Sequence, residues 1–181
     1  MLRTNEIFTR MTAQEFEQFV MKLFTESINS DNNILFQHNE IIKTSEGNYQ
    51  IDGTIRFEVM GVKYLTLVEC KMYKSPISRE KVQILFDKLR ATGAQKGILV
   101  STSYFQSGAI EYASTHGIAL VQIIDGKLTY QVRSKDSVKI SYPLNLPKYT
   151  AIVQYKINKS TMGYSDAIIT NYLYEFITSI P

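Results

Sequence analysis

The sequence predicts an α/β protein in which a central mixed β-sheet is flanked by helices on both faces. Three observations lead to this fold class. An amphipathic helix begins near residue 12, three strand-like segments follow it, and strands alternate with helices from residue 78 onward. Such alternation is typical of right-handed crossovers in a sheet that is at least partly parallel.

The composition is that of a folded domain with room for its own core. The chain has 181 residues, of which 44% are hydrophobic and 20% charged, and its formal net charge is +3. A chain of this length buries roughly 70% of the surface that it exposes when unfolded. The single cysteine, Cys70, excludes an intrachain disulfide framework and a multi-cysteine zinc site, and it favours the reducing cytoplasm.

We expect the protein not to associate with a membrane. The N-terminal segment is rich in charge and lacks the apolar core of a secretory signal. No apolar run approaches the roughly 20 residues that a membrane-spanning helix needs.

The first predicted element is a helix with a capping box. Thr12 is the expected N-cap, and Glu15 follows it at the spacing of the reciprocal hydrogen bonds. From Phe16 to Phe24, apolar residues recur at helical spacing and predict one buried face. Glu17 borders this face, so we expect its carboxylate to lie beside the core and not on the far side of the helix.

Three strands are predicted next. They cover roughly residues 34–42, 49–60 and 63–71, with turns at Glu46–Asn48 and at Gly61. A turn at Gly61 would pair the second and third strands as a hairpin, which would bring the level of residue 52 close to that of residue 69.

Beyond these strands the chain alternates between helices and strands. A helix begins after Ser78 and ends at Gly93, which is a typical C-cap. The segments expected after it are a strand ending at Ser101, a helix over about 105–115, a strand over 118–124 and a strand over 127–132.

The last fifty residues are predicted separately. They contain a strand-like segment at 149–157 and a helical segment near 165–177. We therefore divide the chain into a domain at 1–132 and a C-terminal extension at 133–181. The extension is either an appendage to the core or a dimerisation element.

Chemistry is concentrated at the end of the third strand. The two-residue period of a strand places Glu69 and Lys71 on one face and Cys70 on the other. If the hairpin forms, Asp52 lies near Glu69, and two close carboxylates with the Cys70 carbonyl would form an oxygen-rich site that suits Mg²⁺. We read the Cys70 side chain as a core residue and not as a nucleophile. His38 and His116 lack a spacing suited to zinc.

This arrangement resembles the catalytic motif of the PD-(D/E)xK nuclease superfamily, and about 110 residues resemble its Mrr-type restriction endonuclease catalytic domain. The segments that carry the resemblance are Phe16-Glu17, Gln50-Ile51-Asp52-Gly53, Val68-Glu69-Cys70-Lys71, Val82 with Phe86, Gly93–Ser103, Phe105 with Gly108-Ala109, Tyr112-Ala113 and Gly117–Leu120. No proline precedes Asp52, which departs from the pattern. Residues 1–10 and 133–181 lie outside the resemblance.

The resemblance implies a restriction-endonuclease-like domain at 1–132 and assigns roles to five residues. Asp52 and Glu69 would bind the metal, expected to be Mg²⁺ with Mn²⁺ tolerated, and Lys71 would position the attacking water. Glu17 of the first helix would support the site. Gln83 is the counterpart of a polar residue in the crossover helix that often assists.

The net positive charge sits in one block. Residues 69–97 carry seven Lys or Arg residues against three acidic ones. An exposed basic helix is usually a solvated face, but this one directly follows the acidic pair, so we expect backbone contacts with DNA. The candidates for this contact are Tyr73, Lys74, Arg79, Lys81, Lys88 and Arg90.

The sequence thus predicts Mg²⁺-dependent hydrolysis of DNA phosphodiester bonds, and the resemblance implies restriction of foreign DNA. Two alternatives stay open: a junction-resolving or repair nuclease on the same fold, and a catalytically silent DNA-binding module. A junction-resolving nuclease would need a symmetrical dimer, so a homodimer stays an open partner question. No helix-turn-helix domain is evident in the sequence, so a separate protein that supplies specificity stays open as well.

Overall fold

The computed structural model describes residues 11–28, 33–125, 149–156, 162–166 and 172–179, and their strands form one seven-stranded sheet in the order β1 to β7. The elements are α1 (Ala13–Ile28), β1 (Leu35–Thr44), β2 (Gly47–Val59), β3 (Val62–Lys71), α2 (Arg79–Thr92), β4 (Lys96–Ser101), α3 (Ser107–Thr115), β5 (Ile118–Asp125), β6 (Tyr149–Lys156), β7 (Met162–Asp166) and α5 (Tyr172–Thr178).

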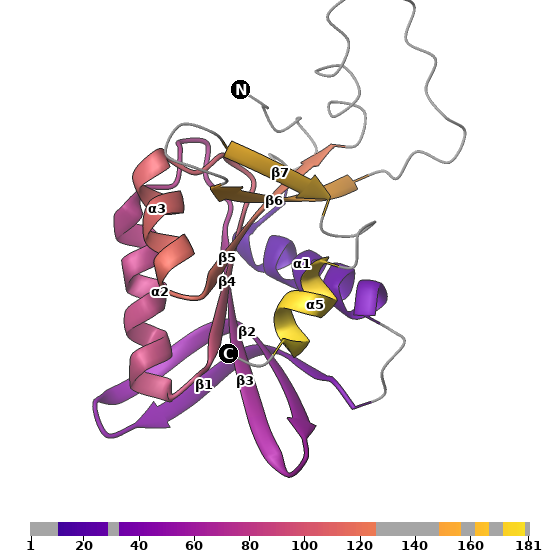
Figure 1. Cartoon of the computed structure of the whole chain (residues 1–181), viewed down its shortest axis with the longest axis vertical. Helices are drawn as coiled ribbons and strands as arrows, with labels where there is room; N and C mark the ends of the chain where they lie inside the picture. The colour runs from indigo at the N-terminus through magenta and orange to yellow at the C-terminus, as the bar shows by residue number, and fades with distance from the viewer. Residues whose placement is uncertain (1–10, 29–32, 126–148, 157–161, 167–171, 180–181) are drawn as a thin grey trace, which may run out of the picture.

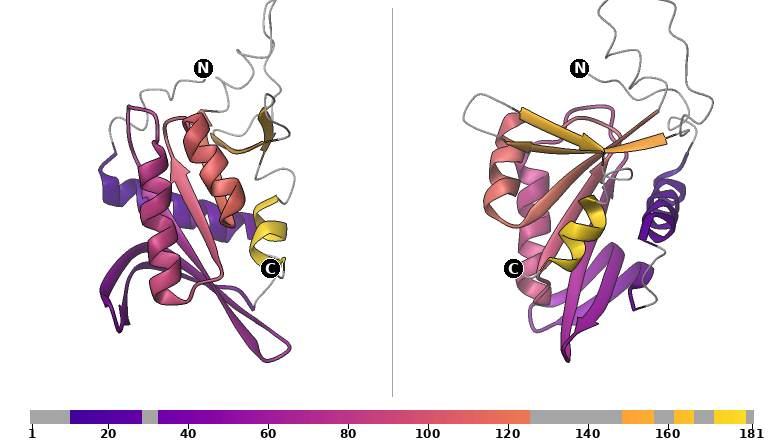
Figure 2. Two further views of the ribbon diagram at one scale, coloured as in Figure 1. Left: turned by 60° about the vertical axis from the view of Figure 1, so that its left-hand side comes forward. Right: turned by 45° about the vertical axis from the view of Figure 1, so that its right-hand side comes forward.

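The sheet is mixed, as the sequence predicts. Strands β3, β4 and β5 run parallel to one another, and each remaining neighbouring pair is antiparallel. The crossovers between the parallel strands are α2 and α3, which lie together on one side of the sheet, whereas α1 and α5 lie on the other (Figures 1 and 2). The predicted α/β class, with helices on both faces, is confirmed.

Two hydrophobic clusters hold these layers together. On one face, buried side chains of α1 and α5, including Phe16, Phe24 and Leu173, pack with β3 to β6. On the other face, Val82 and Leu85 of α2 pack with α3 and with the opposite side of the parallel strands. No helix in the described part of the chain is long and apolar enough to span a membrane.

The predicted helix boundaries of α1 and α2 are confirmed by their caps. The Thr12 N–H donates to Glu15 Oε2 at 2.7 Å, and the Glu15 N–H donates to Thr12 Oγ1 at 3.2 Å. Gly93 ends α2 with φ 69°, a left-handed conformation that glycine adopts without strain, and its N–H donates to the Leu89 carbonyl.

The start predicted for the C-terminal helix, near Ser165, is wrong. Ser165 and Asp166 belong to β7, where they pair with Val153 and Ile152 of β6, and the described part of α5 covers Tyr172–Thr178. Pairing with β6 satisfies backbone groups that a helix would otherwise bond internally, and a helical pattern does not reveal this competition. The strand expected over 127–132 lies outside the described residues.

Lys96 belongs to the predicted basic block, but it is buried and binds the end of α5. It is 7% exposed, and its ammonium donates to the backbone carbonyls of Phe176 and Ser179 at the end of α5. A cation at a helix C-terminus complements the carbonyls that have no partner within the helix. The described parts of 133–181 thus join the same sheet and core as the rest, while a role in dimerisation stays a prediction.

Candidate active site

The site forms where β2 separates from β3. Their ladder ends with Gly53 opposite Val68, which sets Asp52 at the level of Glu69 as predicted. Beyond this point the Asp52 side chain takes the place of a backbone acceptor: the Cys70 N–H donates to Asp52 Oδ2 at 2.8 Å. On the other side of β2, Asn39 has φ 54° and no ladder partner. The ladder toward β3 therefore ends at Asp52, whereas the ladder toward β1 skips only Asn39 and resumes at Glu40.

Glu69 and Lys71 end β3 on the face that α2 and α3 cover, which is the alternation predicted from the sequence. Glu69 is only 4% exposed. The Lys71 ammonium lies 2.9 Å from Glu69 Oε2 and 3.7 Å from Asp52 Oδ2, so one cation lies against both carboxylates. The triad of Asp52, Glu69 and Lys71 is brought together in space.

Electrostatics in this triad follow from burial and from the charges that face one another. Burial, followed by repulsion from Glu69, raises the pKa of Asp52 above its ordinary value. Burial acts to lower the pKa of Lys71, but the attraction of Glu69 and Asp52 outweighs it and raises that pKa. At neutral pH Lys71 is therefore an ammonium held between two carboxylates.

Glu17 approaches the same site from α1. Its Oε2 lies 3.3 Å from His38 Nε2, and burial together with repulsion from Asp52 raises the pKa of Glu17. Helix α1 packs closely on Gly53, because a Cβ there would lie 2.2 Å from Met21 Sδ and the Met21 side chain would have to shift. The Glu17 carboxylate thus lies close enough to Asp52 for the two charges to interact, and its role in the site stays a prediction. The contact with His38 was not predicted.

From α2, the residue that reaches the triad is Lys88, for which the sequence predicts a contact with DNA. Its ammonium forms an ion pair with Glu69 Oε1 and donates to the Gln50 carbonyl at 2.9 Å. Gln83 is exposed on α2. An assisting role for Gln83 stays a prediction.

The remaining candidates for DNA contact differ in whether their side chains already have partners within the protein. Arg90 is bound by Glu46 at 2.7 Å and by Asp87 at 3.0 Å. The Arg79 guanidinium lies 5.0 Å from the Tyr112 ring, and Lys81 lies 3.9 Å from Glu80. Those exposed next to the end of β3 are Tyr73 and Lys74.

The donor set suits a hard divalent cation. Asp52 and Glu69 offer carboxylate oxygens and the Cys70 backbone offers a carbonyl, which are the ligand types that Mg²⁺ takes. No group of three or more His, Cys, Asp or Glu side chains is already arranged around one point in the described part of the chain. The Cys70 thiol does not contribute, because it lies in the core and burial raises its pKa.

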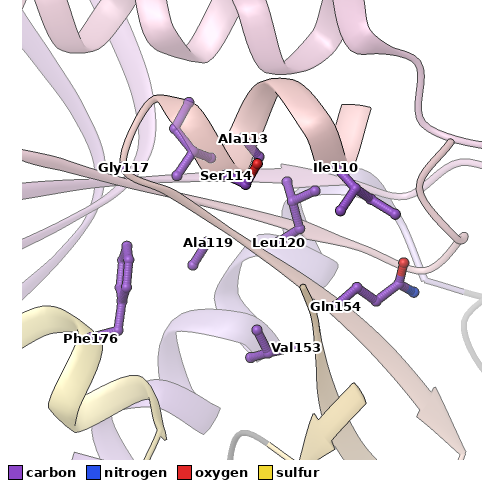
Figure 3. Close-up of a pocket in the computed structure, with 10 residues that line it drawn as sticks. Ile110, Ala113, Ser114, Gly117, Ala119, Leu120, Val153, Gln154 and Phe176 are labelled. Atoms are coloured by element: carbon purple, nitrogen blue, oxygen red, sulfur yellow. The ribbon is translucent and has the colours of Figure 1, made fainter. Parts of the chain in front are cut away.

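A pocket elsewhere in the molecule is unsuited to this chemistry. It has a volume of about 180 Å³ and lies beside α3, β5 and β6, with Phe176 of α5 at one side (Figure 3). None of the described residues that line it is charged. This pocket therefore offers no charged group that could replace the candidate residues at the end of β3.

The match to a known family extends over most of the chain. Residues 8–128 match the Mrr_cat family, described as restriction endonuclease. The Type IV methyl-directed restriction enzyme EcoKMrr of Escherichia coli strain K12 is 29% identical over 104 residues, which make up 56% of this chain and 33% of that enzyme. The chain thus matches only about a third of the length of this relative.

Solved structures provide a comparison of the fold. A protein of unknown function, AF1548, superimposes with a TM-score of 0.50 at 18% identity, over 60% of this chain and 57% of that one. The DNA modification-dependent restriction endonuclease AspBHI superimposes with a TM-score of 0.41 at 19% identity, over 58% and 27% of the two chains.

Proposed function

The chain belongs to the Mrr-type restriction endonuclease family, and from this premise we propose that it is a Mg²⁺-dependent endonuclease that hydrolyses DNA phosphodiester bonds in the restriction of foreign DNA. The observation that carries the proposal is the convergence of Asp52, Glu69 and Lys71 where β2 leaves β3, with Lys71 Nζ within 4 Å of both carboxylates. Family membership alone would not require these side chains to meet.

Each residue of the triad has a distinct role in this proposal. Asp52, Glu69 and the Cys70 carbonyl would hold Mg²⁺, which supplies Lewis-acid stabilisation of the phosphate when bound. The Lys71 ammonium offsets negative charge that develops on the attacked phosphate, and it orients the attacking water. Glu17, whose charge interacts with that of Asp52, would support the site through water or a second metal.

DNA would be held mainly through its backbone. Lys74 and Tyr73 are exposed next to the triad, and Arg79 and Lys81 lie at the start of α2. Contacts from cations to phosphates make affinity fall with salt and carry no sequence information. Sequence or methylation specificity would then come from residues outside this group or from a separate protein.

The direct test is nicking of supercoiled plasmid, unmethylated and methylated, in Mg²⁺ with and without a chelator. We expect cleavage that the chelator abolishes and that Asp52→Asn reduces by at least about 10²-fold. Glu58→Gln is the matched control, because Glu58 is an exposed carboxylate on the same strand, close to the turn at Gly61. This variant should cleave like the wild type.

Other outcomes would redirect the assignment. Cleavage of branched DNA alone would favour a junction-resolving or repair nuclease. Salt-dependent binding of duplex DNA with no cleavage of any substrate would favour the silent binding module. Cleavage that survives the chelator, or that Asp52→Asn leaves intact, would contradict the proposed site.

A further inference from the structure

Lys88 is the charged residue of the site that the proposed mechanism does not use. It projects from α2, and its side chain is 19% exposed while that of Glu69 is 5% exposed. Besides Glu69 it contacts the Gln50 carbonyl at 2.9 Å. A lysine this well enclosed and bound to a candidate metal ligand is not simply part of a solvated helix face.

Both oxygens of Glu69 are already occupied by cations. Lys71 lies 2.9 Å from Oε2, and Lys88 is bound to Oε1. A carboxylate that ligates Mg²⁺ holds the ion at about 2.0–2.1 Å. An ammonium on the same carboxylate would repel an ion at that distance. Each oxygen keeps a second lone-pair site, so a divalent cation can still bind Glu69, but its binding becomes more favourable when one ammonium withdraws.

The contacts indicate which lysine withdraws. Lys71 has a second carboxylate, since Asp52 lies 3.7 Å from its ammonium, and it follows Glu69 on the same strand. The second contact of Lys88 is a neutral backbone carbonyl. Lys88 therefore loses less attraction when it leaves, and its flexible four-carbon stem lets the ammonium swing toward solvent.

We propose that Lys88 occupies Glu69 in the metal-free protein and is displaced when a divalent cation binds there, so that Lys88 sets the metal affinity of the site. This inference rests on the proposed metal site. It makes Lys88 a competitor of the metal and not a residue that holds Glu69 in place for it. The two roles predict changes of opposite sign when the charge is removed.

The test is a titration of the full chain with Mn²⁺ in the absence of DNA, with free Mn²⁺ measured by electron paramagnetic resonance. Lys88→Gln should bind Mn²⁺ roughly tenfold more tightly than the wild type, because a nearby unit charge no longer opposes a divalent ion. Lys88→Arg keeps the charge and should stay within about threefold of the wild type.

Lys63→Gln is the matched control for net charge. Lys63 is exposed close to the turn that joins β2 and β3 and pairs across the ladder with Glu58, far along the strand from Lys71. Its removal should leave Mn²⁺ affinity unchanged. Lys88→Met, which keeps the aliphatic stem, provides the same comparison if Lys88→Gln fails to fold in a thermal unfolding check.

The outcomes separate this inference from the function on which it rests. Weaker or unchanged Mn²⁺ binding by the folded neutral variants would overturn the competition and make Lys88 a positioning residue. Absence of Mn²⁺ binding in the wild type as well would overturn the metal site itself. An equal gain in Lys63→Gln would reduce the effect to net charge and would also overturn the inference.

Discussion

Replacing Lys71 by methionine removes one ammonium and keeps an unbranched side chain of similar length. In the structure this ammonium lies 2.9 Å from Glu69 and 3.7 Å from Asp52, so it is fixed beside both candidate metal ligands. A preorganised group of this kind typically contributes about 10²–10³ in rate, or roughly 3–4 kcal/mol. We therefore expect Lys71→Met to reduce DNA cleavage by at least about 10²-fold at saturating Mg²⁺.

The same substitution should lower stability only moderately. Removing one partner from a buried ion pair costs about 3–5 kcal/mol when the other charge is left alone. The Glu69 side chain, 5% exposed, keeps its ion pair with Lys88 after the substitution. We therefore expect the free energy of unfolding to fall by about 1–2 kcal/mol. A domain with a typical stability of about 5–15 kcal/mol stays folded after such a loss.

Two assays on the same preparations distinguish catalysis from binding. Nicking of supercoiled DNA in Mg²⁺ reports the rate, and a duplex titration in Ca²⁺ at fixed salt reports affinity, which should change by less than about tenfold because Lys71 is one cation among several. Lys22→Met is the control, since the Lys22 side chain is 75% exposed on α1. Cleavage by Lys71→Met at the wild-type rate would remove Lys71 from the mechanism.

Three further predictions concern Asp52, its neighbour Gly53, and a buried pair of glutamines on β5 and β6. Because burial and Glu69 raise the pKa of Asp52, its charge opposes folding, so Asp52→Asn should stabilise the protein by about 0.5–2 kcal/mol at neutral pH. Urea unfolding should show this gain vanish below a pH of about 3.9, where the aspartate is protonated in the folded and unfolded chains alike. Gly53→Ala places a Cβ 2.2 Å from Met21 Sδ, so in the same assay the free energy of unfolding should fall by about 1–3 kcal/mol. Cleavage should also fall as α1 is pushed away. Unchanged stability would contradict the close packing. The buried Gln154 Nε2 donates to Gln122 Oε1 at 2.9 Å, yet Gln122 Nε2 has no partner in the described part of the chain. The double variant Gln122→Met with Gln154→Met should therefore be as stable as the wild type or more stable by about 1 kcal/mol, as measured by chemical denaturation. Gln122→Met alone should be less stable, because it leaves the Gln154 amide without its acceptor.

Local patterns predicted those parts of the site that depend on periodicity. The two-residue period of β3 placed Glu69 and Lys71 on one face, and the hairpin turn at Gly61 set the level of Asp52. Glu17 was found because it borders the apolar face of α1. In each case a single element, or two strands joined by a short turn, determines the geometry.

The features that were missed depend on how separate elements meet. His38 occurs in β1 without a spacing that suggests a ligand, and its contact with Glu17 exists only because α1 packs across β1 and β2. Neither the end of the β2–β3 ladder at Gly53 nor the positive φ of Asn39 on β1 has a marker in the hydrophobic pattern. The sequence pattern predicts helix at Ser165 because the pairing of this residue with β6 is a tertiary interaction.

Lys88 could have been found with the reasoning that identified Glu17. It stands next to Leu89 and one turn after Leu85, both buried, so it borders the apolar face of α2 as Glu17 borders that of α1. Helices α1 and α2 cover opposite faces of the sheet, and the opening between β2 and β3 is where side chains from both can approach the same carboxylates. Asp52 and Glu69 then face an added carboxylate from one side and an added ammonium from the other. A charged residue beside the buried face of a helix that packs on such an opening is therefore a better candidate for the site than an exposed polar residue such as Gln83, even where a resemblance favours the latter.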